Sequence, residues 1–218
     1  MSLKKKIKKL FTIKDKKKFI KKTIICFLGI TGMGFFLSFL IMCGLGTDPY
    51  TFMNRSIAST LGWTLGNWQL LLNAVMLIFV ILIRPKLIGL GTIFNMVLIG
   101  YYADFFCWLW ERLIPSSVFE PGVAQIVIFV IALFGFIISA AIYMNSNLGL
   151  SPYDGTGKII TEWLHKIPFF IVRIAYDSMA IVVGMLFSGT PTIGIILMAV
   201  GLGPAITLVG KYMKKLGI

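Results

Sequence analysis

The chain consists of long apolar runs separated by short polar segments, and this pattern predicts a polytopic membrane protein. A helix needs roughly 20 mostly apolar residues to cross a bilayer. Six runs of suitable length cover residues 23–43, 68–84, 88–110, 124–146, 168–188 and 191–210. Charged residues make up only 13% of the chain, whereas a soluble domain carries about 25%. We therefore expect an all-helical integral membrane protein with six transmembrane helices.

Two of the polar segments have nearly the same sequence and lie 103 residues apart. The first runs from Gly44 to Tyr50 (GLGTDPY), and the second runs from Asn147 to Tyr153 (NLGLSPY). Matches at the same offset extend from residue 32 to residue 203, which chance similarity between apolar runs does not readily produce. The chain is therefore predicted to be a duplication of a three-span unit. The expected parts are a basic segment at 1–22, a first repeat at 23–112, an extracytoplasmic linker at 113–123 and a second repeat at 124–218.

The distribution of basic residues predicts how the chain lies in the membrane. With both termini in the cytoplasm, only Arg55 and Arg112 of the 21 lysines and arginines lie outside, as the positive-inside rule requires. Because each repeat crosses three times, the second repeat lies upside down relative to the first, and such inverted repeats are typical of secondary transporters. The eleven lysines of residues 1–22 are expected to contact anionic lipid headgroups, and nucleic-acid binding is not expected.

A short amphipathic helix is predicted after each polar segment. Asp48 and Ser151 have side chains that cap free backbone N–H groups, and Asp154 follows Ser151 at the spacing of a capping box. Proline suits the first helical position, and glycine permits the sharp turn before it. The residues expected to break the preceding helix and turn the chain are Gly44, Gly46, Pro49, Gly149 and Pro152.

Two interpretations of these short helices stay open at this point. In the first, an apolar face that includes Met53 and Leu61, opposite Asn54, lies on the membrane surface. In the second, the helix N-termini face a cavity, where broken membrane helices bind groups of a solute. Basic residues at equivalent positions of the two helices, Arg55 and Lys158, favour a pair of vestibules on opposite faces.

The repeated motif resembles that of the YczE/YyaS/YitT membrane proteins of bacteria. It reads GLGTDPY at residues 44–50 and LGLSPY at residues 148–153, in a chain with a lysine-rich start and six spans. The resemblance covers nearly the whole chain apart from the lysine segment. The short YczE-like branch is the most similar, since no soluble C-terminal domain follows residue 218. The resemblance implies a multi-pass protein of the bacterial plasma membrane, and it implies no substrate and no functional residues.

Ionisable residues within the predicted spans are further candidates for function, because a charge at the bilayer centre costs about 3 kcal/mol on insertion scales. Asp177 lies near the middle of the fifth span, and Arg173 lies four residues earlier on the same helical face. The two form either a static ion pair or a site that couples transport to a proton or cation. Asp104 lies nearer the outer end of the third span. In the sixth span, candidates for a hinge or for close packing are Gly201, Gly203 and Pro204.

These patterns favour a small secondary transporter of an anionic or zwitterionic solute. The residues expected to bind the solute are Asp48, Tyr50, Arg55, Asn73, Ser151, Tyr153, Asp154 and Lys158. A regulatory or assembly factor that acts through a protein partner, and an intramembrane lipid-handling enzyme, remain as alternatives. The sequence has no catalytic motif, so neither an enzyme nor a cofactor or metal site is expected. A homodimer is plausible, because six helices make a small bundle.

Overall fold

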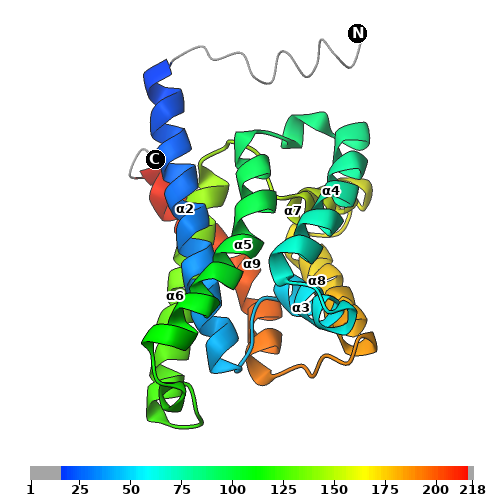
Figure 1. Ribbon diagram of the computed structural model, residues 1–218. Helices are drawn as coiled ribbons and strands as arrows, with labels where there is room; N and C mark the ends of the chain where they lie inside the picture. The colour runs from blue at the N-terminus through cyan, green and yellow to red at the C-terminus, as the bar shows by residue number, and fades with distance from the viewer. Residues whose placement is uncertain (1–15, 216–218) are drawn as a thin grey trace.

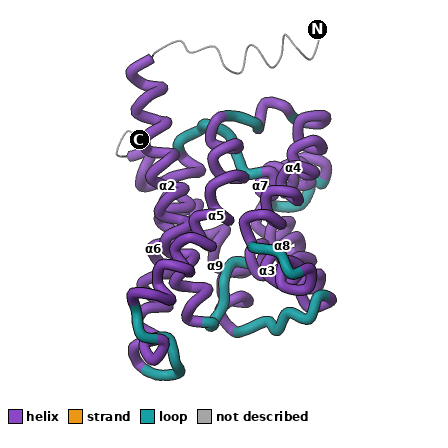
Figure 2. Tube along the Cα trace, in the orientation of Figure 1, coloured by secondary structure: helices purple, strands orange, loops and turns teal. Residues whose placement is uncertain are grey.

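The computed structural model describes residues 16–215, and this part of the chain consists of helices and loops without any strand (Figures 1 and 2). The α-helices are α2 (Lys16–Cys43), α3 (Pro49–Leu61), α4 (Leu65–Ile83), α5 (Leu90–Leu113), α6 (Val123–Asn145), α7 (Pro152–Trp163), α8 (Phe169–Leu186) and α9 (Ile193–Lys215). Two short 3₁₀ helices, η1 (Pro85–Leu87) and η2 (Ser116–Val118), precede α5 and α6. The all-helical prediction is confirmed for the described residues.

Four helices are long and apolar enough to cross a membrane. They are the Phe19–Cys43 part of α2 together with α4, α5 and α6. In α9 the apolar stretch is shorter and covers Ile193–Pro204. Each of the six predicted spans coincides with one helix, but crossing by α8 and α9 stays a prediction. Of the lysine segment, residues 1–15 lie outside the described residues, and Lys16 and Lys17 are exposed at the start of α2.

The turn that precedes each short helix has the same backbone in both motifs. Gly44, directly after α2, has a φ of 67°, and its counterpart Asn147 has a φ of 56°. Two residues further on, Gly46 and Gly149 have φ values of 135° and 111°. Residues that carry a side chain rarely adopt such φ values, so glycine is required at these two positions. The prediction that glycine turns the chain at both motifs is confirmed.

Both short helices are capped in the same way. The carboxylate Oδ2 of Asp48 accepts a hydrogen bond from the backbone N–H of Thr51 at 3.0 Å. The hydroxyl Oγ of Ser151 accepts one from the N–H of Asp154, also at 3.0 Å. A proline is the first residue of each helix. The predicted caps are therefore present, and they fix where α3 and α7 begin.

α3 does not lie on the surface of the bundle, because it packs against α4, α8 and α9. Asn54 is fully buried, whereas Leu61 is 48% exposed. The amide Nδ2 of Asn54 donates to the carbonyl oxygen of Tyr50 at 2.7 Å, so its burial leaves this donor satisfied. The predicted faces of this helix are thus wrong at Asn54 and Leu61. By contrast, Ile57 is buried and Arg55 is exposed, as the sequence predicted. The sequence pattern of α3 was interpreted as that of a helix lying on the membrane surface, whereas α3 packs against other helices.

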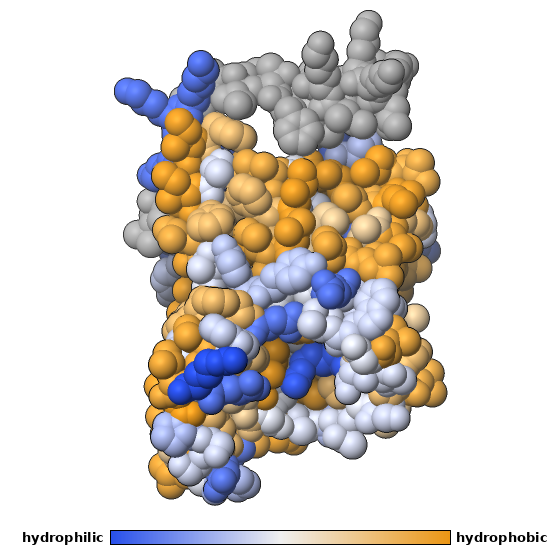
Figure 3. Space-filling view, in the orientation of Figure 1, coloured by the Kyte–Doolittle hydropathy of each residue, from blue (hydrophilic) through white to orange (hydrophobic). Residues whose placement is uncertain are grey.

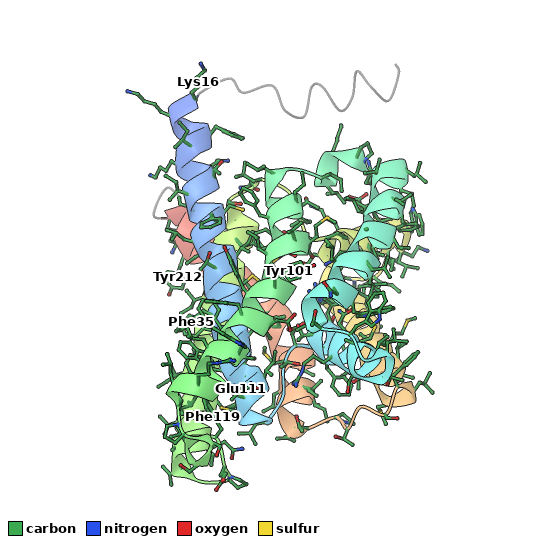
Figure 4. The ribbon with its side chains drawn as sticks, viewed as in Figure 1. Lys16, Phe35, Tyr101, Glu111, Phe119 and Tyr212 are labelled. Atoms are coloured by element: carbon green, nitrogen blue, oxygen red, sulfur yellow. The ribbon has the colours of Figure 1, made fainter. Side chains whose placement is uncertain are left out.

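α2 and α6 pack side by side and run in opposite directions. In Figure 1, α2 starts at the top of the view, whereas α6 starts at the bottom, near the residue labelled Phe119 in Figure 4. Glycines permit the close approach: a Cβ on Gly32 would lie 2.5 Å from Ser139 Oγ, and one on Gly135 would lie 2.5 Å from the ring of Phe36. The two contacts are related by the 103-residue offset, with the partners exchanged.

Each motif also docks on the other half of the chain. The backbone N–H of Gly194, at the start of α9, donates to the carbonyl of Leu45 at 3.1 Å. In the same way the N–H of Gly91, at the start of α5, donates to the carbonyl of Leu148 at 2.8 Å. Likewise, α3 of the first half packs on α8 of the second half, and α7 of the second half packs on α4 of the first half. Contacts that recur with exchanged partners are those of an interface with two-fold symmetry.

α9 is a continuous helix through Pro204, so the chain is not broken at this residue. A Cβ on Gly201 would meet no described atom within 4 Å. This glycine therefore does not bring α9 close to another described helix, while close packing at Gly203 stays a prediction. A hinge at this point of α9 stays a prediction.

Candidate functional site

The two capped helices begin at one shared cavity in the centre of the bundle. Its volume is about 60 Å³. From the motifs, it is lined by Asp48, Tyr50, Thr51, Ser151, Tyr153 and Asp154. Further polar lining comes from Gln69 of α4, Asn95 of α5 and Arg173 of α8. The sequence predicted separate vestibules for the two motifs, whereas the structure brings their N-terminal residues together.

The tyrosines of the two motifs stack on each other across this cavity. The ring centroids of Tyr50 and Tyr153 are 4.2 Å apart, with an angle of 28° between the ring planes. The two residues are equivalent at the 103-residue offset, so the pseudo-two-fold axis passes between them. The other neighbour of Tyr153 is Tyr176 of α8, whose ring is stacked at 4.4 Å.

Each tyrosine hydroxyl donates a hydrogen bond to the next long helix of its own half. Tyr50 donates to Asn73 Oδ1 at 2.8 Å, and Tyr153 donates to Asp177 Oδ1 at 2.7 Å. These acceptors are 104 residues apart, so one residue has been inserted between the motif and α8. In this register Gln69 is the counterpart of Arg173. The first half therefore has a neutral pair where the second half has an ion pair.

Arg173 joins two carboxylates beneath Tyr153. Its Nε donates to Asp177 Oδ2 at 2.9 Å, and its NH1 donates to Asp154 Oδ1. Asp177 is 1% exposed, so this is a buried ion pair, and its charges depend on one another. The second oxygen of Asp154 accepts from the Ser151 hydroxyl at 2.7 Å. The predicted pair of α8 is thus present and includes a third member from α7.

Asp48 is the fourth ionisable residue at the centre. One oxygen, Oδ2, caps α3, whereas Oδ1 is buried and accepts no hydrogen bond from the described residues. The side chain precedes α3 and lies outside the four candidate spans. Burial raises the pKa of this carboxyl above its ordinary value, and the bonds from Thr51 offset part of that rise. A buried acceptor without a partner is costly. Among the described residues, Gln69 Oε1 and the Tyr143 hydroxyl, which belong to the same cavity lining, are also buried without a partner.

A larger cavity of about 640 Å³ opens between the first motif, α3 and the loop that joins α8 to α9. Arg55 lines it and is exposed. Hydroxyl groups line much of the rest, including those of Ser56, Ser59, Thr60, Thr190 and Thr192. We refer to this cavity as the vestibule.

In the corresponding region of the second half, two contacts join separate segments of the chain. Leu150, the counterpart of Thr47, donates its backbone N–H to the carbonyl of Leu87 at 3.0 Å. Nearby, Arg84 NH2 and Glu162 Oε2 form a salt bridge of 2.6 Å between α4 and α7. Lys158, the counterpart of Arg55, is exposed and lines neither the vestibule nor the central cavity. Arg55 and Lys158 therefore have different surroundings, and the two halves also differ in charge.

Asp104 lies apart from the central cavity. Its Oδ2 accepts a hydrogen bond of 2.7 Å from the backbone N–H of Gly66, in the first turn of α4. With Arg55 and Glu111 it lines a further recess. In the view of Figure 3, hydrophilic residues gather in the lower half of the molecule, while the upper half is mostly apolar. The bond from Gly66 means that Asp104 satisfies one N–H group at the start of α4, whose N-cap residue is Thr64.

In residues 16–215 there is no group of three His, Cys, Asp or Glu side chains placed to hold a metal ion.

The model of the DUF6198 family, described as a family of unknown function, matches residues 20–211. The chain belongs to this family. No solved structure matches it.

Relatives of this DUF6198 protein include two from Bacillus subtilis. Uncharacterized protein YyaS is 27% identical over 172 residues, which are 78% of this chain and 83% of YyaS. Uncharacterized membrane protein YczE is 28% identical over 118 residues, or 54% of this chain and 52% of YczE. An uncharacterized protein of Haemophilus influenzae is 27% identical over 195 residues, covering 87% and 82% of the two chains. These matches confirm the resemblance to YczE and YyaS.

Sequence reasoning about this DUF6198 chain missed two residues of the centre, Gln69 and Tyr176. The signal for Gln69 was present, because Gln69 and Asn73 have the same four-residue spacing as Arg173 and Asp177. It was concealed by the single inserted residue, which moves the equivalent positions of α4 and α8 out of the 103-residue register. Tyr176 had no such signal, since a tyrosine in an apolar helix is commonly a packing residue.

Proposed function

We propose that this DUF6198 protein is a small secondary transporter of a polar solute. The observation that carries the proposal is the shared central cavity, where the N-termini of α3 and α7 meet with their equivalent tyrosines stacked. Transporters built from repeats bind their solutes near the bilayer midplane, at the repeat interface, with the ends of interrupted helices directed at the solute. The caps, Asp48 and Ser151, and the pair Arg173 and Asp177 are the polar groups available to such a solute.

The proposed topology has six spans, formed by α2, α4, α5, α6, α8 and α9. Each half then crosses three times, and the halves lie in opposite orientations in a bacterial plasma membrane, with both termini in the cytoplasm. The opposite directions of α2 and α6 support this arrangement (Figure 1). The exchanged hydrogen bonds at Leu45 and Leu148 support it independently, because they relate the halves by a two-fold axis.

The open vestibule and the closed region opposite it correspond to one state of alternating access. In the proposed topology the vestibule, with Arg55, faces the outside of the cell. The salt bridge between Arg84 and Glu162 then closes the cytoplasmic side. In the opposite state the second half would open around Lys158, and the vestibule would close. Arg173 and Asp177 are proposed to couple this change to the solute or to an accompanying cation.

The electrostatics of the centre favour a zwitterionic or cationic solute over a bare anion. Three carboxylates, those of Asp48, Asp154 and Asp177, face the single guanidinium of Arg173. A free anion would have to compete with these carboxyl groups for a guanidinium that already binds two of them. The anionic solute that the sequence suggested is therefore not part of the proposal.

Cysteine labelling tests the topology directly. We expect Thr60→Cys to react with a membrane-impermeant thiol reagent only from outside in sealed cells, and Thr161→Cys only from inside in inverted vesicles. The two positions lie near equivalent ends of α3 and α7, and the native Cys26, Cys43 and Cys107 are free thiols that must first be replaced. Labelling of both positions from one side would refute the inverted repeats and the transport mechanism with them.

Weakening the closed side is expected to shift the equilibrium between the two states. Ile159, the counterpart of Ser56, is fully buried in the closed half, whereas Ser56 lines the vestibule. Glu162→Gln should raise the labelling rate of Ile159→Cys from inside by about twofold to fivefold, since a partly exposed salt bridge contributes roughly 0.2–1 kcal/mol. Labelling of Ser56→Cys from outside should fall correspondingly.

The matched control for this shift is Glu120→Gln, which removes an exposed carboxylate far along the chain from the salt bridge. It should leave both labelling rates unchanged. If Glu162→Gln has no effect while the control behaves as expected, Arg84 and Glu162 form a surface contact without a part in closure.

A further inference from the structure

We propose that the central cavity binds a small positive charge at Oδ1 of Asp48, either an inorganic monovalent cation or the protonated primary amine of the solute. This inference names the ligand chemistry of the proposed transport site and rests on that function. Four observations support it: the charge balance of the centre, the comparison of the two caps, the unpartnered oxygen and the size of the cavity.

The charge balance leaves Asp48 without a direct ion pair to any described residue, although the charge of Arg173 attracts its carboxylate. Among the described residues, Arg173 is the one basic residue that lines the cavity, and it forms ion pairs with Asp154 and Asp177. The guanidinium is thus already shared between two carboxylates. Asp48 is 8% exposed, and no described basic side chain forms an ion pair with it. Desolvation makes an unpaired buried charge costly, so a cation beside Asp48 would stabilise the ionised carboxylate against its neutral form.

The comparison of the two halves indicates that Asp48 has a role beyond capping. Its counterpart Ser151 caps α7 with a hydroxyl, at the same distance of 3.0 Å. Serine and aspartate are about equally good caps, so α3 does not require a carboxylate. The cap uses only Oδ2, whereas Oδ1 is left buried without a hydrogen-bond donor among the described residues. The extra oxygen and its charge are available to a ligand.

The size of the cavity fits a small group. Its volume of about 60 Å³ has room for a few groups of the size of a water molecule, since a site needs about 10–15 Å³ of such volume to hold one water. An ammonium group or a monovalent metal ion is of this size. A carboxylate group of a solute would meet both Asp48 and Asp154 at the cavity wall, which disfavours it.

Thermal unfolding of the purified full-length protein in detergent tests this site. The midpoint is measured at constant ionic strength in sodium chloride, in methylammonium chloride and in choline chloride, whose cation is too large for the cavity. We expect sodium or methylammonium to raise the midpoint relative to choline in a saturable manner. A response to sodium identifies an inorganic cation site, and a response to methylammonium alone identifies the amine group of a solute.

Asp48→Ser is the decisive variant, because serine keeps the helix cap, as Ser151 does in the other half. Its apparent affinity for the responding cation should fall roughly tenfold or more, as for loss of a charged hydrogen-bond partner. Asp48→Asn provides a second test with unchanged side-chain size. Asp104→Asn is the matched control, since it removes a carboxylate that contacts a helix start outside the central cavity, and its cation response should be that of the wild type.

The proposal is overturned if neither sodium nor methylammonium differs from choline in the wild-type protein, or if the response survives in Asp48→Ser or Asp48→Asn. The assay detects binding and requires no movement between states. A cation response combined with same-side labelling of Thr60→Cys and Thr161→Cys would retain the binding site and reject transport. Opposite-side labelling without a cation response would do the reverse.

Discussion

Arg173→Met is expected to destabilise the protein by about 3–5 kcal/mol, because removing one partner of a buried ion pair leaves uncompensated charge. Here the effect should be at the upper end, since Asp154 and Asp177 both rely on this guanidinium. The stacking of Tyr153 next to the network would also be disturbed. The measurement is the midpoint of unfolding in detergent, together with the fraction of protein that elutes as a single species in size-exclusion chromatography.

A compensated variant separates loss of charge pairing from loss of packing. Combining Arg173→Gln, Asp177→Asn and Asp154→Thr gives the second half the residues that the first half has at the equivalent positions. Because no unpaired charge remains, this triple variant should regain most of the stability lost in Arg173→Met. A triple variant as unstable as the single one would show that the ion pairs are not the reason for the loss.

Gly149→Ala is expected to destabilise the protein by more than the cost of its backbone conformation alone. A non-glycine residue at a φ of 111° is strained by about 1–3 kcal/mol. In addition, the new Cβ would lie 2.5 Å from Thr92 Oγ1 and in contact with the backbone of Gly89. The clash would push the second motif away from the start of α5, where Leu148 is bonded to Gly91. Thermal unfolding measures the sum of the two effects.

Two other glycines serve as controls for this substitution. At Gly44 the φ is 67°, but a Cβ would meet nothing within 4 Å, so Gly44→Ala shows the backbone cost alone. Gly201 lies inside α9, and alanine there should be neutral or stabilising by up to about 1 kcal/mol. Equal losses for Gly149→Ala and Gly44→Ala would mean that the contact between the motif and α5 contributes nothing.

The local features of the fold could be predicted from the sequence because they depend on neighbouring residues. The caps at Asp48 and Ser151, the prolines after them and the turn at Gly149 follow from backbone chemistry within a few positions. The pairing of Arg173 with Asp177 follows from helical spacing in the same way. Residue-to-residue distances along one helix are fixed, so such pairs can be recognised without a structure.

Features that depend on two distant segments could not be predicted. Nothing near Asn54 indicates that α8 and α9 cover its helix, so a buried polar residue was assigned to an exposed face. The third member of the ion-pair network, Asp154, was expected to cap α7 and to bind the solute, but its pairing with Arg173 was not predicted, because this contact crosses from α7 to α8. Likewise, the assignment of Arg55 and Lys158 to equivalent vestibules assumed that the two halves are in the same state.

The neutral pair on α4 and the ion pair on α8 occupy equivalent places on either side of the stacked Tyr50 and Tyr153. If the halves were two copies of one gene product, each substitution would appear at both places, and the centre would contain either two ion pairs or none. A single chain is free of this restriction, because each half mutates alone. Fusion of the halves thus permits one buried charge network instead of two, with a permanent direction that an assembly of identical subunits cannot possess.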